Sequence, residues 1–155
     1  MRRFVLDEWL WADLQGENGE EAQRQSFQLL LEIYERCDQV VTVEGSAFLK
    51  KFYDLCEKAG PGDPRRSIVR DFKDRFLLNS EKLIRLREEE LPAVPTEIAD
   101  AIEDKDRYLV RSYIAAQAKL VVTTDNPLLE TLRNSRINCL DREGFLSHYL
   151  GGASA

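Results

Sequence analysis

Acidic residues follow three of the short apolar runs in this sequence. Asp7 and Glu8 come directly after Phe-Val-Leu, Glu44 follows Gln-Val-Val-Thr-Val, and Asp125 stands two residues after Lys-Leu-Val-Val-Thr. If these runs are parallel strands, their carboxyl ends meet at one edge of a sheet, which is where such sheets bind ligands. Carboxylates gathered there repel one another unless a cation is bound. Oxygen ligands without histidine or cysteine favour Mg²⁺ or Mn²⁺ over Zn²⁺, so the pattern predicts a metal site that activates water for phosphodiester hydrolysis.

Some of the acids have a simpler interpretation as helix caps. Asp104 and Asp106 precede an apolar helical pattern, and Asp141 follows the last apolar run. An aspartate after a strand often caps the next helix, and a chain with 28 acids is expected to place some of them there by coincidence. We interpret Asp141 as a cap and Asp104 as a cap or a rim charge, with Asp104 also a candidate additional acid of the site. For Asp7, Asp106 and Asp125, the pattern leaves both a cap and a metal ligand open.

The spacing of the apolar residues predicts alternating strands and helices. Apolar residues recur at helical spacing in residues 27–34, 48–55 and 109–116, and Asp63-Pro64 is expected to begin a helix that continues to residue 76. The stretch 82–90 is open between a helix and an edge strand. The predicted strands are residues 4–6, 39–43, 119–123 and 136–140. This alternation predicts an α/β fold with a mainly parallel sheet, because parallel neighbours need crossover connections.

The composition is that of an ordinary globular domain. The 155 residues are 43% hydrophobic and 32% charged, and the formal net charge of -6 excludes a histone-like basic protein. We expect one domain over residues 1–150 and a flexible tail over 151–155. The apolar runs are too short to cross a membrane, and early acids disrupt a signal peptide, so the chain is expected to begin at Met1. Three cysteines without a CxxC pair indicate a reducing, cytoplasmic location.

Several segments occur in the order that one known family shows. Residues 4–7 read Phe-Val-Leu-Asp, and Asp106 precedes an alanine-containing helical stretch that leads into Val-Val-Thr-Thr-Asp at 121–125. Asn-Pro-Leu-Leu then follows, and the chain closes with Ile-Asn-Cys-Leu at 137–140 and Glu-Gly-Phe-Leu at 143–146. On these segments the chain resembles the PIN-domain family of metal-dependent nucleases over most of its length.

The resemblance implies both a fold and a site. The family fold is a three-layer α/β/α arrangement, here with a mainly parallel sheet of about four or five strands. Asp7, Asp106 and Asp125 would hold Mg²⁺ or Mn²⁺, and the Thr123 hydroxyl would support them by hydrogen bonding. A member of the family would cleave single-stranded RNA, or structured nucleic acid, with a metal-activated water. Many small members are toxins that an antitoxin neutralises, and the fold commonly forms homodimers.

The chain departs from the family pattern at two places. Glu8 and Trp9 stand where the family has a small polar residue and then asparagine. The family also has an acid near the position of Ala47 or Phe48. Glu44 or Glu8 is a candidate replacement for that acid. The alternative function is a catalytically silent PIN-like module that binds RNA or a protein partner.

Basic residues concentrate in one part of the chain. Residues 50–87 contain 11 Lys and Arg against 6 Asp and Glu, a local balance of +5. A helix face formed by Arg65, Arg66, Arg70 and Lys73 is a candidate contact surface for nucleic-acid phosphates. The alternative is a solvated helix face whose charge nearby acids offset.

Trp9 and Trp11 also have two interpretations. They could stack on unpaired bases beside the acids. The interpretation that we favour is that they fill the space between the sheet and its first helix.

Overall fold

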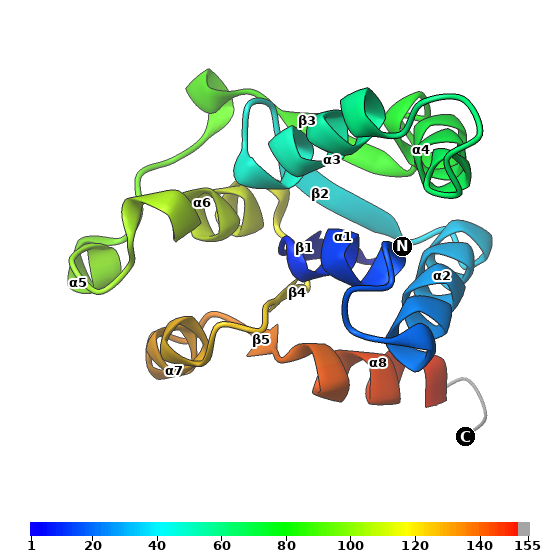
Figure 1. The fold of residues 1–155 in the computed structure, drawn as a ribbon. Helices are drawn as coiled ribbons and strands as arrows, with labels where there is room; N and C mark the ends of the chain where they lie inside the picture. Colours follow the sequence, from blue (N-terminus) through cyan, green and yellow to red (C-terminus); the bar gives the residue numbers. More distant parts are fainter. Residues whose placement is uncertain (152–155) are drawn as a thin grey trace.

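The computed structural model describes residues 1–151 and has a parallel, five-stranded sheet at its centre (Figure 1). The strand order is β3-β2-β1-β4-β5, and every neighbouring pair is parallel. The strands are β1 (Arg3–Leu6), β2 (Gln39–Val43), β3 (Leu83–Leu86), β4 (Leu120–Val122) and β5 (Cys139–Leu140). All four predicted strands are present, and the stretch that was open between helix and strand supplies the edge strand β3.

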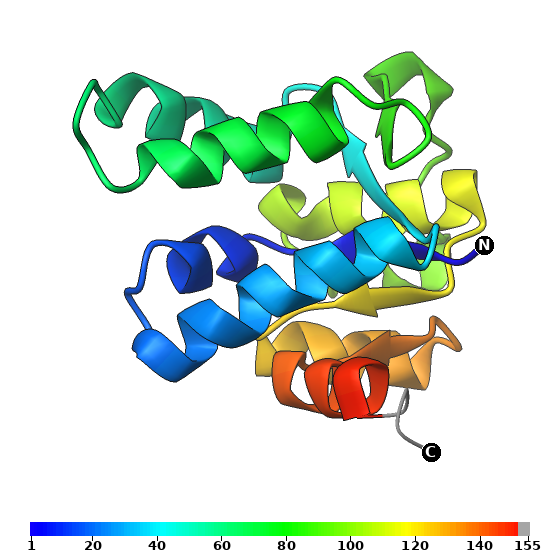
Figure 2. The same ribbon diagram turned by 90° about the vertical axis from the view of Figure 1, so that its right-hand side faces the viewer.

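Helices cover both faces of the sheet (Figures 1 and 2), which confirms the predicted three-layer α/β/α arrangement. One face packs against α1 (Trp9–Leu14), α2 (Glu20–Glu35), α3 (Ala47–Lys58), α4 (Arg66–Phe72) and α8 (Arg142–Gly151). The other packs against α5 (Thr96–Ala99), α6 (Arg107–Ala116) and α7 (Asn126–Asn134). The short helical segments are η1 (Lys73–Leu77), a π-helix, and the 3₁₀ turns η2 (Glu88–Glu90) and η3 (Asp104–Asp106). The expected tail at 152–155 lies outside the described residues, and Gly151 is the last residue of α8.

The central strands are apolar because both of their faces are buried. Phe4 and Leu6 of β1 belong to the core on one side of the sheet, and Val5 belongs to the core on the other side. All three are at most 1% exposed. Buried parallel strands are expected to be apolar throughout, and β1 therefore reads as a continuous run rather than an alternating pattern. The first residue after this run, Asp7, leaves the sheet at its carboxyl edge.

The two tryptophans fill the core between the sheet and its helices, as we favoured from the sequence. Trp9 is 6% exposed and Trp11 is 1% exposed. The Trp9 indole donates a hydrogen bond to the Val122 carbonyl at 3.0 Å, and the Trp11 indole donates to the Phe48 carbonyl at 2.8 Å. Their polar atoms are thus satisfied inside the protein, so α1 is held against β4 and the start of α3.

Some boundaries differ from the prediction for local reasons. The helix expected from Asp63-Pro64 begins only at Arg66, because the Asp63 carboxylate accepts the Arg65 backbone N–H at 2.8 Å and holds the preceding residues in a turn. The last strand, expected over 136–140, is reduced to Cys139–Leu140. Arg136 has a φ of 64°, in the left-handed region that an extended strand excludes. Within residues 1–151, no helix is long and apolar enough to span a membrane.

Candidate metal site at the carboxyl edge of the sheet

A buried threonine connects the ends of the two central strands. The Thr123 hydroxyl donates a hydrogen bond to Asp7 Oδ2 at 2.6 Å and accepts one from the Asp125 backbone N–H at 3.2 Å. Thr123 is fully buried, and the Asp7 N–H donates to the Val122 carbonyl at 3.0 Å. Because β1 and β4 are neighbours, the residues that follow them meet at the same edge, as predicted. The structure therefore brings Asp7 and Asp125 together around one hydroxyl.

Both of these carboxylates also make local hydrogen bonds. Asp125 is the N-cap of α7, and its Oδ1 accepts the Leu128 N–H at 3.1 Å. Asp7 Oδ1 accepts the Glu8 N–H at 2.7 Å. A carboxylate has about four lone-pair directions, so one or two such bonds do not use up its capacity as an acceptor. The two interpretations that were open for Asp125 are thus compatible, because a capping carboxylate can still offer a free lone pair.

Asp106 arrives at the same edge from a third element, the start of α6. It occupies the N-cap position, but its side chain makes no capping hydrogen bond. Burial raises the pKa of its carboxyl to about 6, and the negative charges of Asp7 and Asp125 contribute to the rise. These contributions require the three acids to be near one another. We call Asp7, Asp106 and Asp125 the acid cluster.

A buried hydroxyl without a hydrogen-bond partner lies beside the acid cluster. The Tyr108 hydroxyl oxygen is shielded from solvent and finds no partner among residues 1–151. Burial raises the pKa of this phenol, and the charges of Asp7, Glu8 and Asp106 add to the rise. The Phe48 backbone N–H lies close enough to the hydroxyl oxygen to oppose that rise, but not in hydrogen-bond geometry, and the hydroxyl proton has no acceptor among residues 1–151. An unsatisfied buried hydroxyl costs about 1–3 kcal/mol, which makes the position unusual. Sequence reasoning missed Tyr108, since nothing in its spacing from Asp106 distinguishes a buried hydroxyl from an ordinary core tyrosine.

The chemistry of the acid cluster fits a hard divalent cation, although its side chains are not arranged around one. Three carboxylates without histidine or cysteine are the donor set that Mg²⁺ and Mn²⁺ prefer. Across residues 1–151, no three acidic, histidine or cysteine side chains are placed so that they already coordinate one ion. The carboxylates of Asp7 and Asp125 are turned toward their own hydrogen bonds.

Glu44, Asp104 and Glu8, the further candidate acids, each lie near a cation. Glu44 pairs with Arg85 at 2.7 Å, and Arg85 belongs to β3, on the opposite side of β2 from β1. Asp104 is 95% exposed and lies 3.3 Å from Arg107, on the rim as interpreted. Glu8 is closer to the cluster, since its charge acts on Tyr108, and it faces Lys51 at 3.8 Å. Asp141 is a cap, as interpreted, because its Oδ1 accepts the Gly144 N–H at 2.6 Å.

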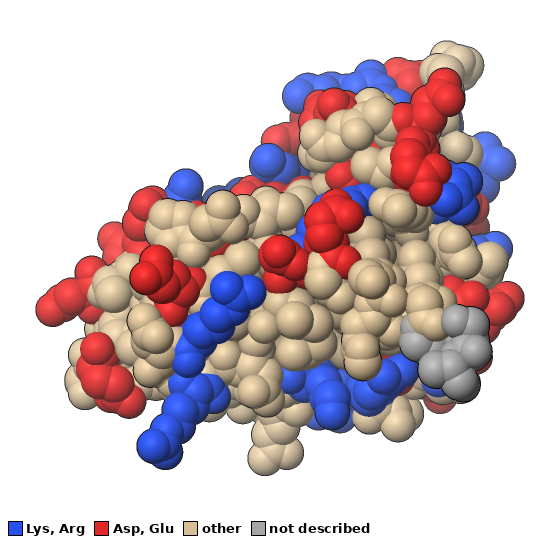
Figure 3. Space-filling view, turned by 90° about the horizontal axis from the view of Figure 1, so that it is seen from below, with Lys and Arg blue, Asp and Glu red and all other residues tan. Residues whose placement is uncertain are grey.

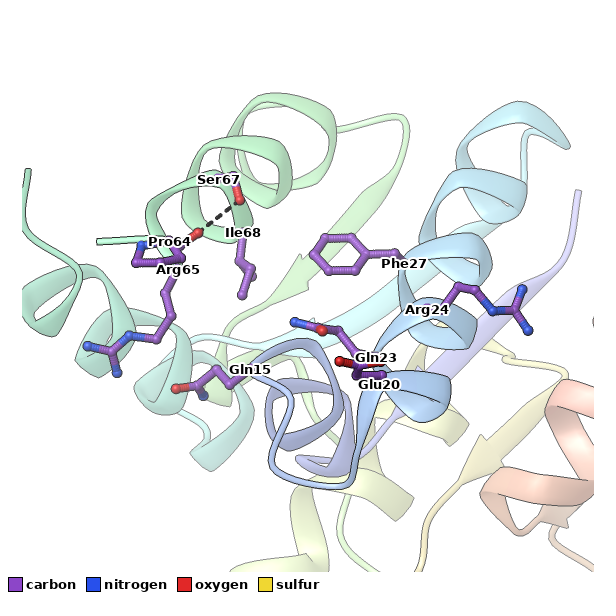
Figure 4. Close-up of a pocket in the computed structure, with 9 residues that line it drawn as sticks. All are labelled: Gln15, Glu20, Gln23, Arg24, Phe27, Pro64, Arg65, Ser67 and Ile68. Carbon is purple, nitrogen blue, oxygen red and sulfur yellow. Dashed lines mark hydrogen bonds between the residues drawn. The ribbon is translucent and has the colours of Figure 1, made fainter. Parts of the chain in front are cut away.

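The predicted basic face divides into two separate places. Arg65 lies at the edge of a hollow of about 340 Å³ between α2 and α4 (Figure 4), and its guanidinium pairs with Asp63 at 2.7 Å. Arg66, Arg70 and Lys73 line a different groove, between α3 and α4. The four residues that the sequence grouped therefore do not act as one surface. Charges of both signs are scattered over the face seen from below, with uncharged areas between them (Figure 3).

Comparisons with known proteins add no relative. The chain matches no protein-family model, and no curated protein is similar to it. The description of the site therefore rests on its own residues.

Proposed function

We propose that the protein is a metal-dependent ribonuclease that hydrolyses phosphodiester bonds of single-stranded RNA at the acid cluster. The observation that carries this proposal is the convergence of three carboxylates from three elements. Asp7 and Asp125 meet at the Thr123 hydroxyl, and their charges add to the rise in the pKa of Asp106 to about 6, which burial causes first. Structural ion pairs balance opposite charges. Here the single Lys105 ammonium acts on Asp106 and Asp125 but does not cancel the three carboxylates at the sheet edge, and a protein tolerates such an excess of like charge for a function.

Asp7, Asp106 and Asp125 would hold the ion. Mg²⁺ or Mn²⁺ would supply a water activated for attack on phosphorus and would stabilise the leaving oxygen. Thr123 positions the Asp7 carboxylate through its 2.6 Å hydrogen bond and fixes the backbone of Asp125. The Tyr108 hydroxyl lies beside these acids as a free donor, available to a ligand in the site.

The proposal also covers the substrate, the compartment and the oligomeric state. RNA is the substrate, the compartment is the cytoplasm, and the protein acts as a homodimer. A toxin role, with an antitoxin as the protein partner, is a specific form of the proposal. Growth arrest on expression, relieved by co-expression of the adjacent gene product, is its test. Growth that is unaffected by expression of a cleaving enzyme contradicts the toxin role and leaves the ribonuclease proposal intact.

The decisive experiment is RNA cleavage by matched variants. Purified protein is incubated with labelled single-stranded RNA and Mn²⁺, beside Asp125→Asn and Asp7→Asn. Asparagine also caps helices well, so Asp125→Asn keeps α7 while removing a charged ligand. Asp104→Asn is the control, because this exposed acid stands two residues from Asp106 and outside the cluster. We expect cleavage by the wild type and the control and none by the two cluster variants. Retained cleavage in both cluster variants contradicts the proposal.

A second function has one observation in its favour. Glu44, a candidate for the missing fourth acid, is paired with Arg85 instead of lying with the acid cluster. A site with three acids binds metal more weakly, which favours a catalytically silent module that binds RNA or a protein partner. The same experiment separates the two functions. RNA binding that Mn²⁺ does not change, without any cleavage, supports the silent module.

A further inference from the structure

We propose that the groove between α3 and α4 binds the phosphodiester backbone of a single-stranded nucleic acid, with Tyr53 stacking on one of its bases. The groove has a volume of about 370 Å³ and shares no residue with the acid cluster. We call it the basic groove, and its lining residues are Cys56, Arg66, Val69, Arg70, Lys73 and Asp74. This inference rests on the proposed action on RNA and adds where the strand is held outside the acid cluster.

The basic groove carries uncompensated positive charge. Arg66, Arg70 and Lys73 are spaced four and three residues apart, so one side of the helix presents all three. All three are exposed, and none lies within 4.0 Å of an acidic group of the described chain, although Asp74 is also in the groove. Most other arginines of the protein are paired, as Arg65 is with Asp63. Arg66 donates one hydrogen bond to the Ala59 carbonyl at 3.1 Å, which leaves its charge uncompensated. Exposed cations without acidic partners are the feature that a polyanion recognises.

The neighbouring helix α3 presents an exposed aromatic ring. Tyr53 is 42% exposed, although large aromatic side chains in this protein are otherwise mostly buried. It stands three residues before Cys56 on α3, so both residues lie on the same side of that helix. A charged groove that tracks the backbone, together with an aromatic ring for the bases, is the usual construction of a single-strand site. A site for free phosphate would not need the ring.

The basic groove and the acid cluster are formed by different elements. The groove is lined by the second half of α3 and by α4, and the cluster is formed by residues that follow β1 and β4 and precede α6. The groove is therefore proposed as a holding site separate from the cluster.

The test is RNA binding in EDTA, where no cleavage takes place. Fluorescence anisotropy of a labelled single-stranded RNA is measured over a series of salt concentrations for the wild type and for Arg70→Gln/Lys73→Gln. The control is Lys119→Gln/Arg133→Gln, which removes the same charge from residues outside the groove. Each phosphate contact on a single strand contributes about 0.7 to the slope of log affinity against log salt. We expect the groove variant to reduce that slope by about 1.4 and the control to leave it unchanged.

Tyr53→Leu separates the ring from the charges. We expect it to weaken binding of single-stranded RNA about fivefold or more, without changing the salt slope. Equal slopes in the wild type and the groove variant, or binding that Tyr53→Leu leaves intact, overturn the proposal. Cleavage assays with Mn²⁺ on the same preparations keep the two proposals distinct. If the groove variant has a smaller salt slope but the wild type does not cleave RNA, only the ribonuclease proposal is contradicted. If the wild type cleaves RNA but the groove variant keeps the wild-type salt slope, only the groove proposal is contradicted.

Discussion

Replacing Asp106 with asparagine should stabilise the metal-free protein at neutral pH. The carboxyl pKa is raised from the ordinary value of 3.8 to about 6, first by burial and then by Asp7 and Asp125. A tenfold change in acidity corresponds to about 1.4 kcal/mol, so this rise bounds the penalty of ionising Asp106 at about 3 kcal/mol. The side chain is only partly buried, and solvent screening reduces the expected effect to about 1 kcal/mol.

The sign of the effect depends on pH. A folded-state pKa above the unfolded value means that the folded protein binds the proton more tightly, so the penalty is absent below about pH 4 and fully present above about pH 6. Asp106→Asn should therefore raise the free energy of unfolding by about 1 kcal/mol at pH 7 and by almost nothing at pH 4. For a chain of this length the gain at pH 7 corresponds to an increase in Tm of about 2–4 °C.

Urea unfolding at the two pH values, in EDTA, measures this difference. Asp104→Asn is the matched control and should change the free energy of unfolding by less than about 0.5 kcal/mol at either pH, because its side chain is 95% exposed. Added Mn²⁺ should stabilise the wild type more than Asp106→Asn, since a ligand stabilises only the form that binds it. A variant that is less stable than the wild type at pH 7, or equally stabilised at pH 4 and pH 7, refutes the reasoning.

Three further substitutions test the surroundings of the site. Thr123→Val should lower the free energy of unfolding in urea by about 1–3 kcal/mol, because it leaves Asp7 without its hydroxyl donor. A decrease of less than about 0.5 kcal/mol would show that the hydrogen bond between Thr123 and Asp7 does not stabilise the fold. Tyr108→Phe should leave the Tm of the metal-free protein unchanged or raise it, since the hydroxyl has no partner in the described chain. A clear decrease in Tm would reveal a partner that the geometry does not show. Arg142→Leu should cost about 3–5 kcal/mol, because Asp13 is fully buried and lies 2.5 Å from this guanidinium. The double variant Asp13→Leu/Arg142→Leu should recover only part of that loss, because it leaves the buried Ser26 hydroxyl and the Asn18 amide without their Asp13 acceptor. No recovery at all would show that the uncompensated Asp13 charge is not the source of the loss.

The sequence predicted those elements of the fold whose apolar pattern is contained within the element itself. β1 and β2 are continuous apolar runs because both faces of each strand are covered. β3 could not be separated from a helix, because only Leu83 of its four residues is buried and the strand lies at the sheet edge. A half-covered edge strand with charged residues has no clear period of its own. Its identity depends on pairing with β2, which is a non-local contact.

The candidate site shows the same division between local and non-local information. That Asp7 and Asp125 would meet follows from two strand ends and the rule for parallel sheets. The pairing of Glu44 with Arg85 joins residues that are 41 apart in the chain, so the sequence left Glu44 as an open candidate. The pairing of Arg65 with Asp63 is local and could have been anticipated from an aspartate two residues earlier. Burial of the Tyr108 hydroxyl has no signal in the sequence, because it depends on how several elements pack around one atom.

Two helix ends and the Lys105 ammonium, which acts on Asp106 and Asp125, make the acid cluster tolerable without an ion. Asp106 begins α6 and Asp125 begins α7, so two helix N-termini point toward the region where the three negative charges gather. Each N-terminus carries the equivalent of about half a positive charge, and this favours nearby carboxylates by about 0.3–1 kcal/mol. That gain offsets part of the repulsion but not all of it, since the pKa of Asp106 remains raised. The metal-free protein is therefore expected to fold, and the residual repulsion is the free energy that a bound divalent cation would remove.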